Sequence, residues 1–330
     1  MRYREFGGTG WDVSEVGYGM WGMAGWTGSA EEESLASLER AIELGCNFFD
    51  TAYAYGDGHS ERLLGEILRR HPDEPLYVAT KIPPKNRRWP ARAEYPLDDV
   101  FPSDYIREYA EKSLGNLGVE TIDLLQFHVW NDRWADDERW QRAVEALKTE
   151  GLVRAIGISI NRWEPWNGVR AVRSGQIDAV QVIYNIFDQN PEDELFPACR
   201  EMDVAVIARV PFDEGTLTGT LTKDSKWPEG DWRNTYFVPE NLIPSVEKAD
   251  EVKKALEGWN RERSQHITMP ELALRFILGN PDVSTIIPGM RKLAHVEANI
   301  AASDVGPLPP DLQEKMRAFR WVRKPAAWSQ

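Results

Sequence analysis

The chain has 330 residues, of which 42% are hydrophobic and 28% charged, proportions typical of a globular protein with a sizeable core. Its formal net charge of −14 disfavours a nucleic-acid partner, because an acidic surface repels phosphate. No apolar run is long enough to span a bilayer and the start shows no signal-peptide pattern, so we expect a cytoplasmic protein without a membrane partner.

Eight short apolar runs alternate with amphipathic segments along the chain. Several runs are almost continuously apolar, as expected of strands buried on both faces. This alternation predicts parallel strands joined by helices, and eight strands predict an α/β fold of the (β/α)8 TIM-barrel type, with residues 1–330 in one domain. The runs cover residues 15–20, 47–50, 76–81, 122–128, 153–159, 179–184, 204–210 and 284–289.

Several segments between the runs carry helix-boundary signals. Ser29 and Glu32, and later Thr268 and Glu271, have the spacing of a capping box at a helix start. The longest irregular stretch runs from Asp213 to about residue 244, and a loop of that length in a compact fold is usually functional.

The glycines of the first run have the spacing G-x-G-x-x-G, at Gly17, Gly19 and Gly22. This spacing also occurs in dinucleotide-binding Rossmann domains, where a helix begins at the last glycine and an acidic residue follows about 20 residues later. Here the predicted helix cap is at Ser29, and Asp50 lies 28 residues beyond Gly22. We therefore favour a glycine-rich turn after the first barrel strand.

The two cysteines, Cys46 and Cys199, are too few for a disulfide framework and form no C-x-x-C pair. Both lie in apolar contexts, so we expect buried, reduced thiols and no metal site.

Polar residues follow three consecutive predicted strands. Asp50, Lys81 and His128 end the second, third and fourth runs, and Tyr55 lies in the loop after Asp50. Taken singly, each has an ordinary structural role, such as capping a turn or filling a core. In a barrel, however, the carboxyl ends of the strands meet at one mouth, where active sites lie, and a buried lysine needs a partner such as Asp50.

These four residue types suit proton transfer to a carbonyl oxygen. A tyrosine has a pKa near 10, and we expect Lys81 to lower the pKa of Tyr55 so that it serves as the acid. Asp50 would orient Lys81, and His128 would donate a hydrogen bond to the same oxygen. Because none of the four supplies electrons, carbonyl reduction would need a hydride donor such as nicotinamide.

The chain resembles the aldo-keto reductase superfamily over nearly its whole length. The resemblance rests on the segments FFDTAYAYGDGHSERLLG, IDLLQFH, LVRAIGIS, TLTGTLT and IIPGMRKLAHVEANIAA, and on REFGGTGWDVSEVGYG near the start. It implies a barrel whose bottom is closed by an amino-terminal hairpin, an extended NADP(H), with NAD(H) as an alternative, and direct hydride transfer to a carbonyl. Asp50, Tyr55, Lys81 and His128 match the family's catalytic tetrad.

The resemblance also assigns cofactor contacts along the chain. Ser159 and Gln181 would hold the carboxamide, and Arg291 would bind a 2′-phosphate at the start of a helix opening at residues 289–292, which favours NADP over NAD. The full set is Gly19, Met20, Trp21, Asp50, Ser159, Gln181, Arg209, Pro211, Phe212, Gly215, Leu217, Gly289, Met290, Arg291, His295 and Asn299.

Three positions depart from the family pattern. Ile160 separates Ser159 from Asn161, which puts a carboxamide contact by Asn161 in doubt, because a one-residue shift turns a side chain to the other face. Arg209 stands where an aromatic residue usually stacks on nicotinamide, and its charge would favour the reduced cofactor. Ala298 stands where an acidic residue often contacts adenine.

The substrate is expected to be a small carbonyl compound or a sugar, held by Trp21, Tyr55, His128 and Trp130. Two other functions are compatible with the sequence: a sugar or polyol dehydrogenase working toward oxidation, and a cofactor-sensing subunit without turnover. The oligomeric state is not readable from the chain. Aromatic faces suit such substrates, and tryptophans are abundant in the predicted loops and tail. They are Trp21, Trp26, Trp89, Trp130, Trp134, Trp321 and Trp328.

Overall fold

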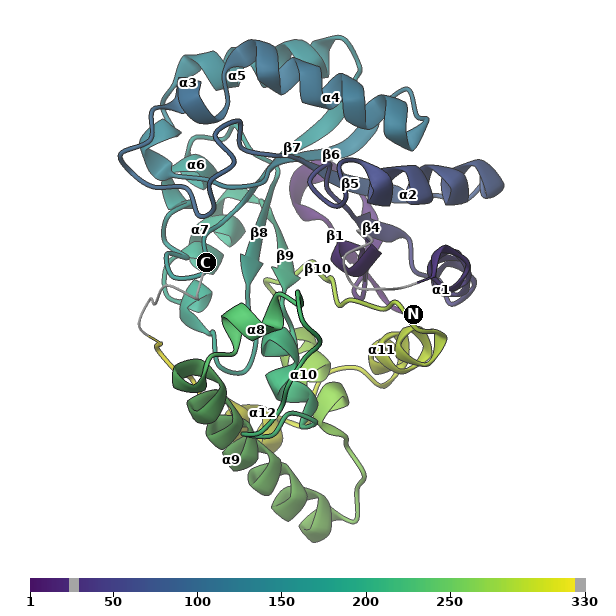
Figure 1. Ribbon diagram of the computed structural model, residues 1–330, viewed down its shortest axis with the longest axis vertical. Helices are drawn as coiled ribbons and strands as arrows, with labels where there is room; N and C mark the ends of the chain where they lie inside the picture. The colour runs from purple at the N-terminus through teal and green to yellow at the C-terminus, as the bar shows by residue number, and fades with distance from the viewer. Residues whose placement is uncertain (24–29, 324–330) are drawn as a thin grey trace.

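A barrel of eight parallel strands forms the centre of the molecule (Figure 1). This computed structural model describes residues 1–23 and 30–323. Every strand overlaps one of the eight predicted runs, so the predicted barrel is confirmed. In chain order the strands are β3 (Tyr18–Gly19), β4 (Phe48–Asp50), β5 (Tyr77–Ile82), β6 (Ile122–Phe127), β7 (Val153–Ser159), β8 (Ala179–Ile183), β9 (Ala205–Arg209) and β10 (Thr285–Ile286).

The first and last strands close the barrel through a short seam. Isolated parallel bridges join Val16 to Ile286 and Gly19 to Gly289, and the amide of Gly17 donates to the carbonyl of Ile286 at 2.8 Å. A Cβ atom at Gly19 would lie 2.5 Å from the carbonyl oxygen of Ile287, so no other residue fits there without moving the backbone. The G-x-G-x-x-G spacing thus serves barrel closure, and the preference for a turn over a Rossmann unit is confirmed.

Helices cover the outside of the barrel (Figure 1). They are α1 (Glu31–Glu43), α2 (His59–Arg70), α3 (Leu97–Val100), α4 (Ser103–Leu117), α5 (Glu138–Thr149), α6 (Val169–Arg173), α7 (Leu195–Met202), α8 (Arg233–Tyr236), α9 (Pro239–Arg263), α10 (Met269–Leu278), α11 (Leu293–Val305) and α12 (Pro310–Arg317). None of those in the described ranges is both long and apolar enough to cross a membrane.

The predicted helix starts are only partly correct. Thr268 caps α10 by accepting a hydrogen bond from the amide of Glu271, as predicted. Ala30 holds the cap position of α1, and the proposed cap Ser29 lies outside the described residues. The irregular stretch after β9 is shorter than predicted, because α9 already begins at Pro239.

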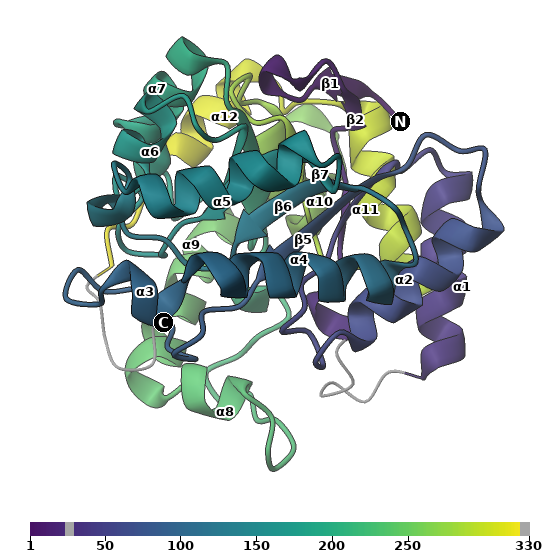
Figure 2. The same cartoon turned by 90° about the horizontal axis from the view of Figure 1, so that it is seen from above.

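An antiparallel hairpin closes the bottom of the barrel. It consists of β1 (Tyr3–Glu5) and β2 (Asp12–Ser14), and it lies at the opposite end from α8 (Figure 2). Phe6, Trp11 and Val13 pack in one cluster with the lower barrel residues, as the family resemblance implied. The other members of this cluster are Phe48, Ala79, Leu124, Ala155, Ala179, Ala205, Ile207 and Ile287.

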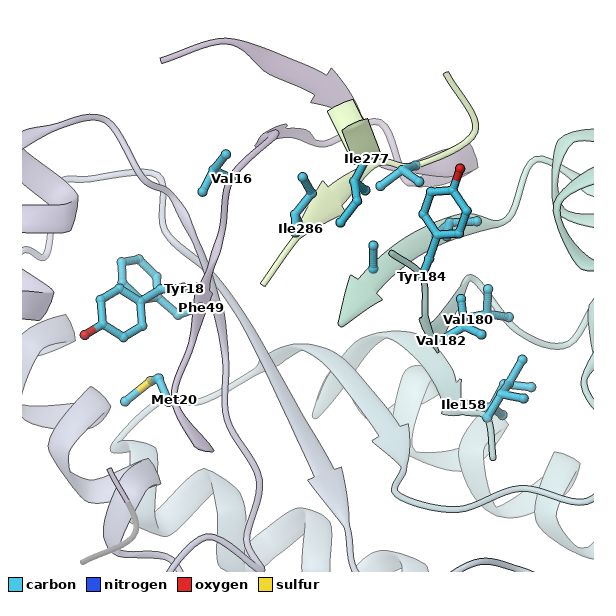
Figure 3. Packing of buried hydrophobic residues seen from close by; sticks show 14 of the residues in the cluster. Val16, Tyr18, Met20, Phe49, Ile158, Val180, Val182, Tyr184, Ile277 and Ile286 are labelled. Atoms are coloured by element: carbon cyan, nitrogen blue, oxygen red, sulfur yellow. The ribbon is translucent and has the colours of Figure 1, made fainter. Parts of the chain in front are cut away.

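Alternation along the strands separates an outer apolar layer from the barrel interior. Outward residues such as Tyr18, Phe49, Val180 and Val182 belong to the core between the sheet and the helices (Figure 3). The inward residues are small or apolar at the bottom of the strands and polar at their carboxyl ends. These polar residues are Asp50, Lys81, Gln126, Ser159, Gln181 and Arg209.

Candidate active site

Asp50, Lys81 and Tyr55 meet at the carboxyl ends of β4 and β5. The Lys81 ammonium lies 2.6 Å from the Asp50 carboxylate, and it also donates to the carbonyl of Thr51 at 2.6 Å. The same ammonium lies 3.5 Å from the Tyr55 hydroxyl. The predicted pairing of Lys81 with Asp50 is confirmed, and the phenol and the ammonium lie at one end of the barrel.

Two glutamines hold the other oxygen of Asp50. Gln181 on β8 donates to Asp50 Oδ2 at 2.8 Å and Gln126 on β6 donates to it at 3.2 Å. Strand alternation explains this arrangement, because Gln126 and Gln181 are the inward residues of the same upper layer. The sequence analysis missed Gln126, although it lies two residues before His128 and therefore points to the same side of the strand.

His128 lies beside Tyr55 in an aromatic row. Its ring centroid is 5.7 Å from that of Tyr55 and 5.8 Å from that of Trp89, both in edge-on contact. Burial, and then the charges of Lys81 and Arg209, hold the pKa of His128 well below its ordinary value. His128 is therefore a neutral imidazole at physiological pH, and its buried Nδ1 has no hydrogen-bond partner within the described ranges.

The net pKa shift of Tyr55 differs from the prediction. Burial raises the pKa of Tyr55 above its ordinary value, and the charge of Lys81 only partly offsets this effect. The expectation of a lowered pKa was therefore wrong in direction, because the hydroxyl lies deeper in the protein than its loop position indicates. Tyr55 is 8% exposed and remains a phenol at neutral pH.

A cavity of about 490 Å³ opens above these residues. Tyr55 lines it, and most of the predicted cofactor contacts do too. Those that line it are Gly19, Trp21, Asp50, Gln181, Arg209, Pro211, Phe212, Gly215, Gly289, Met290, Arg291 and His295. A larger cavity of about 630 Å³ lies against the hairpin and contains none of the predicted site residues.

Four predicted cofactor contacts do not line the cavity. The side chains of Met20 and Leu217 are fully buried in the apolar core. Ser159 and Asn299 are also buried and lie outside the lining. Cofactor contacts by these four residues stay predictions.

The lining fits an extended dinucleotide. Asp50, Tyr55 and Gln181 offer polar groups at the strand ends, while three cations line the remainder: Arg233, Arg291 and Lys292. A Cβ atom at Gly289 would meet nothing within 4 Å, so the backbone there leaves open space beside the cavity. The predicted helix start is displaced, because α11 begins at Leu293 and Lys292 holds its cap position.

The three positions that depart from the family pattern differ in their surroundings. Asn161 donates to the carbonyl of Ala91 at 2.9 Å and does not line the cavity. Arg209 lines the cavity, and its guanidinium reaches the carbonyl of Ile160 at 3.0 Å. Ala298 is an exposed residue of α11.

The loops around the cavity contain residues that the sequence analysis did not assign. Trp232 from the segment before α8 meets Trp21 edge-on at 5.2 Å, and both line the cavity. Glu214 lines it as well, from the turn η5 (Asp213–Thr218) that follows β9. The only sequence signal for these residues was the length of the irregular stretch after β9.

A buried group that we call the tail-anchoring cluster holds η5 in place. It consists of Arg162, Asp188, Asp213 and Arg323. Asp213 lies 2.6 Å from Arg162 and 2.7 Å from Arg323, and Asp188 lies 2.7 Å from Arg323. The cluster thereby joins the loops after β7, β8 and β9 to the chain beyond α12.

Trp130, the predicted substrate contact, is buried in the apolar core and does not line the cavity. Its side chain is 0% exposed, packs against Phe127, Trp134 and Trp140, and donates to Asp132 at 2.9 Å. Trp89 is 38% exposed and meets His128 edge-on. Trp26 and Trp328 lie outside the described residues.

The two cysteines are buried and unpaired, as predicted. Burial raises the pKa of each thiol to about 12, so both are protonated and unreactive at neutral pH. Across residues 1–23 and 30–323, no three His, Cys, Asp or Glu side chains are grouped so as to hold a metal ion.

Comparison with known proteins gives consistent matches along the chain. The family model for the Aldo/keto reductase family matches residues 15–320. The chain is 32% identical over 322 residues to the uncharacterized oxidoreductase YqkF of Bacillus subtilis (strain 168), covering 97% of this chain and 96% of the relative. It is 29% identical over 318 residues to the NADH-specific methylglyoxal reductase of Escherichia coli (strain K12), covering 92% and 94%. The structure is similar to the glycerol dehydrogenase AKR11B4 from Gluconobacter oxydans, with a TM-score of 0.77 and 25% identity over 98% of both chains.

Proposed function

Because the chain belongs to the aldo/keto reductase family of oxidoreductases, which use NADP(H) or NAD(H), we propose that it reduces an aldehyde or ketone to the alcohol with NADPH. Asp50, Tyr55, Lys81 and His128 are the proposed catalytic residues. The observation that carries the proposal is the Tyr55 phenol, which lines the cavity with a lysine ammonium 3.5 Å from its hydroxyl.

Tyr55 serves as the proton donor. A nicotinamide held in the cavity would supply the hydride that the carbonyl carbon needs. The hydroxyl of Tyr55 gives its proton to the carbonyl oxygen. Lys81 stabilises the phenolate that this transfer leaves, and Asp50 keeps Lys81 charged and oriented. His128, as a neutral imidazole, donates a hydrogen bond to the same oxygen.

The raised pKa of Tyr55 favours the reductive direction. A phenol that stays protonated at neutral pH is ready to act as an acid but must first lose its proton to act as a base. The rate of reduction should therefore be insensitive to pH near neutrality and fall as the pH rises through the pKa of Tyr55, above about 10.

The cations of the cavity support binding of a phosphorylated dinucleotide. Arg291 offers a planar fork suited to a 2′-phosphate, with Lys292 and Arg233 along the same wall. Gln181 is placed to hold the carboxamide, since it already lies against Asp50. We assign the substrate wall to Trp21, Tyr55, His128 and Trp89.

The test is a turnover assay with NADPH and a panel of carbonyl compounds, followed by the absorbance of the reduced nicotinamide. The panel should begin with methylglyoxal, because a relative is named for that substrate. It should extend to aromatic aldehydes and to open-chain sugars, since Trp89 and Trp21 offer aromatic faces. Binding of NADPH without turnover of any carbonyl would contradict the proposal and favour a cofactor-sensing subunit.

A polyol dehydrogenase is the second candidate, because the structural relative from Gluconobacter oxydans is named a glycerol dehydrogenase. Oxidation of a polyol requires Tyr55 to act as a base. Rates of glycerol oxidation and of glyceraldehyde reduction at the same pH separate the two candidates. An oxidation rate that exceeds the reduction rate at neutral pH would favour the dehydrogenase.

A further inference from the structure

Arg209 places a cation in the active site. It ends β9 as an inward residue and lines the cavity together with Tyr55, Asp50 and Gln181. Its guanidinium donates to the carbonyl of Ile160 at 3.0 Å, and its buried Nε has no partner within the described ranges. No carboxylate of residues 1–23 or 30–323 lies within 4.0 Å of it.

The carboxylates near Arg209 are paired with other cations. Lys81 and Asp50 form their own pair at 2.6 Å. Glu214 is the acidic residue with the largest influence on Arg209, but its carboxylate lies 3.8 Å from Arg162 and outside ion-pair distance of Arg209. Arg209 is therefore a cation close to Tyr55 that is not held in an ion pair by any carboxylate of the described residues.

This charge acts on the ring of the cofactor that the proposed function requires. The ring that gives up a hydride must lie in the part of the cavity that Tyr55 lines. A reduced nicotinamide is uncharged and an oxidised one is a cation, whereas the remainder of the two nucleotides is identical. A cation held beside the ring thus raises the free energy of the oxidised form alone, whether the guanidinium lies under the ring or at its edge.

We propose that Arg209 makes this site bind the reduced nicotinamide nucleotide more tightly than the oxidised one. The inference rests on the proposed function, because it needs a nicotinamide in the cavity. It has two consequences for catalysis. The site loads the reduced nucleotide selectively, and it releases the oxidised product more readily after each reduction.

The ratio of the dissociation constants of NADP⁺ and NADPH isolates this effect. Contacts to the phosphates and the adenosine are the same in both forms and cancel in the ratio. Isothermal titration of the wild-type chain with each nucleotide should give a Kd for NADP⁺ about tenfold or more above that for NADPH, and tenfold corresponds to about 1.4 kcal/mol.

Two substitutions of Arg209 separate charge from shape. Arg209→Gln keeps an N–H donor for the carbonyl of Ile160 and removes the charge, so the ratio should fall by about tenfold, equivalent to about 30 mV for a two-electron couple. Arg209→Lys keeps the charge, and its ratio should stay within about threefold of the wild-type value. If thermal melting shows Arg209→Gln to be unfolded, Arg209→Met provides the neutral variant.

Arg233→Gln is the matched control. Arg233 also lines the cavity, but its guanidinium is paired with the Asp231 carboxylate at 2.6 Å. Asp231 and Arg233 flank Trp232 in the chain. Removal of the Arg233 guanidinium should change both dissociation constants by the same factor and leave the ratio unchanged.

Three outcomes would overturn the inference. The first is a ratio of the NADP⁺ and NADPH dissociation constants in Arg209→Gln that stays within about twofold of the wild-type ratio. The second is a fall of that ratio in Arg233→Gln as large as the fall in Arg209→Gln. Either would leave the proposed function intact if the wild-type chain still reduces carbonyls. Failure of the wild-type chain to bind either nucleotide would overturn both proposals together.

Discussion

The two groups of buried charge at the mouth of the barrel are balanced differently. In the tail-anchoring cluster, two arginines face two aspartates, and each guanidinium lies within 3.3 Å of a carboxylate. In the active site, Lys81 has one carboxylate and Arg209 has none at ion-pair distance in the part of the chain that the structure describes.

This difference distinguishes a charge cluster that holds loops together from a site that binds a ligand. A buried charge without a partner costs several kcal/mol, so a cluster that only joins loops gains from complete pairing. In the active site, Arg209 lines the cavity without a carboxylate at ion-pair distance among residues 1–23 and 30–323. The imbalance therefore lies where a bound molecule completes the electrostatics.

The strongest test of the active-site group is Tyr55→Phe. Loss of the proton donor should lower kcat by about two to four orders of magnitude, because the carbonyl oxygen then loses the acid that protonates it. The dissociation constant for NADPH, measured by titration, should change by less than about twofold. An equally large loss of NADPH binding would contradict the role given to Tyr55.

Lys81→Met tests whether the pair beneath Tyr55 serves stability as well as chemistry. It leaves the Asp50 carboxylate buried with only amide partners, and we expect the free energy of unfolding to fall by about 3–5 kcal/mol in denaturant titrations. The double variant Asp50→Asn with Lys81→Met should recover most of that stability and none of the activity. Recovery of activity would show that the pair is structural only.

Asp213→Asn tests the balanced cluster. It leaves Arg162 and Arg323 to share Asp188, and we expect a loss of about 2–3 kcal/mol in stability at pH 7. Calorimetric melting of the wild type and the variant measures this loss. Equal melting temperatures would mean that the cluster contributes nothing to the anchoring of η5.

The same variant has a pH signature. Burial alone would raise the pKa of Asp213, but the charges of Arg323 and Arg162 outweigh burial and lower it below its ordinary value of about 3.9. The stabilisation is therefore complete above that pH and is lost as the pH falls through the pKa of the folded state. The stability gap between wild type and Asp213→Asn should close in that acid range and stay constant above it.

Arg291→Ala is expected to have the smallest effect. It should weaken NADPH binding by about tenfold and NADH binding by less than about twofold, because only NADPH carries the 2′-phosphate. Titration with the two nucleotides measures the contrast. A uniform loss would show that Arg291 does not meet that phosphate.

The barrel and the centre of the site were predictable because both follow from strand period and strand ends. Asp50 and Lys81 end neighbouring parallel strands, so their meeting needs no information beyond the order of the runs. Gln126 was missed although the same alternation places it beside them.

Other features depend on distances that the sequence does not contain. The sign of the pKa shift of Tyr55 depends on the depth of its hydroxyl, which the loop position did not show. Trp130 and Trp89 are both aromatic residues in loops, and only packing shows that the first is internal and the second faces His128. The tail-anchoring cluster joins residues far apart in the chain, so no local pattern identifies it.

The seam between β3 and β10 has a mechanical consequence. Both strands have only two residues, so this joint has fewer ladder bonds than the long pairing of β6 with β7 and should fray first in hydrogen-exchange experiments. Trp21 and Arg291 line the cavity from opposite sides of this joint. A molecule that spans the cavity therefore links the two edges of this joint, and its departure allows them to open more often.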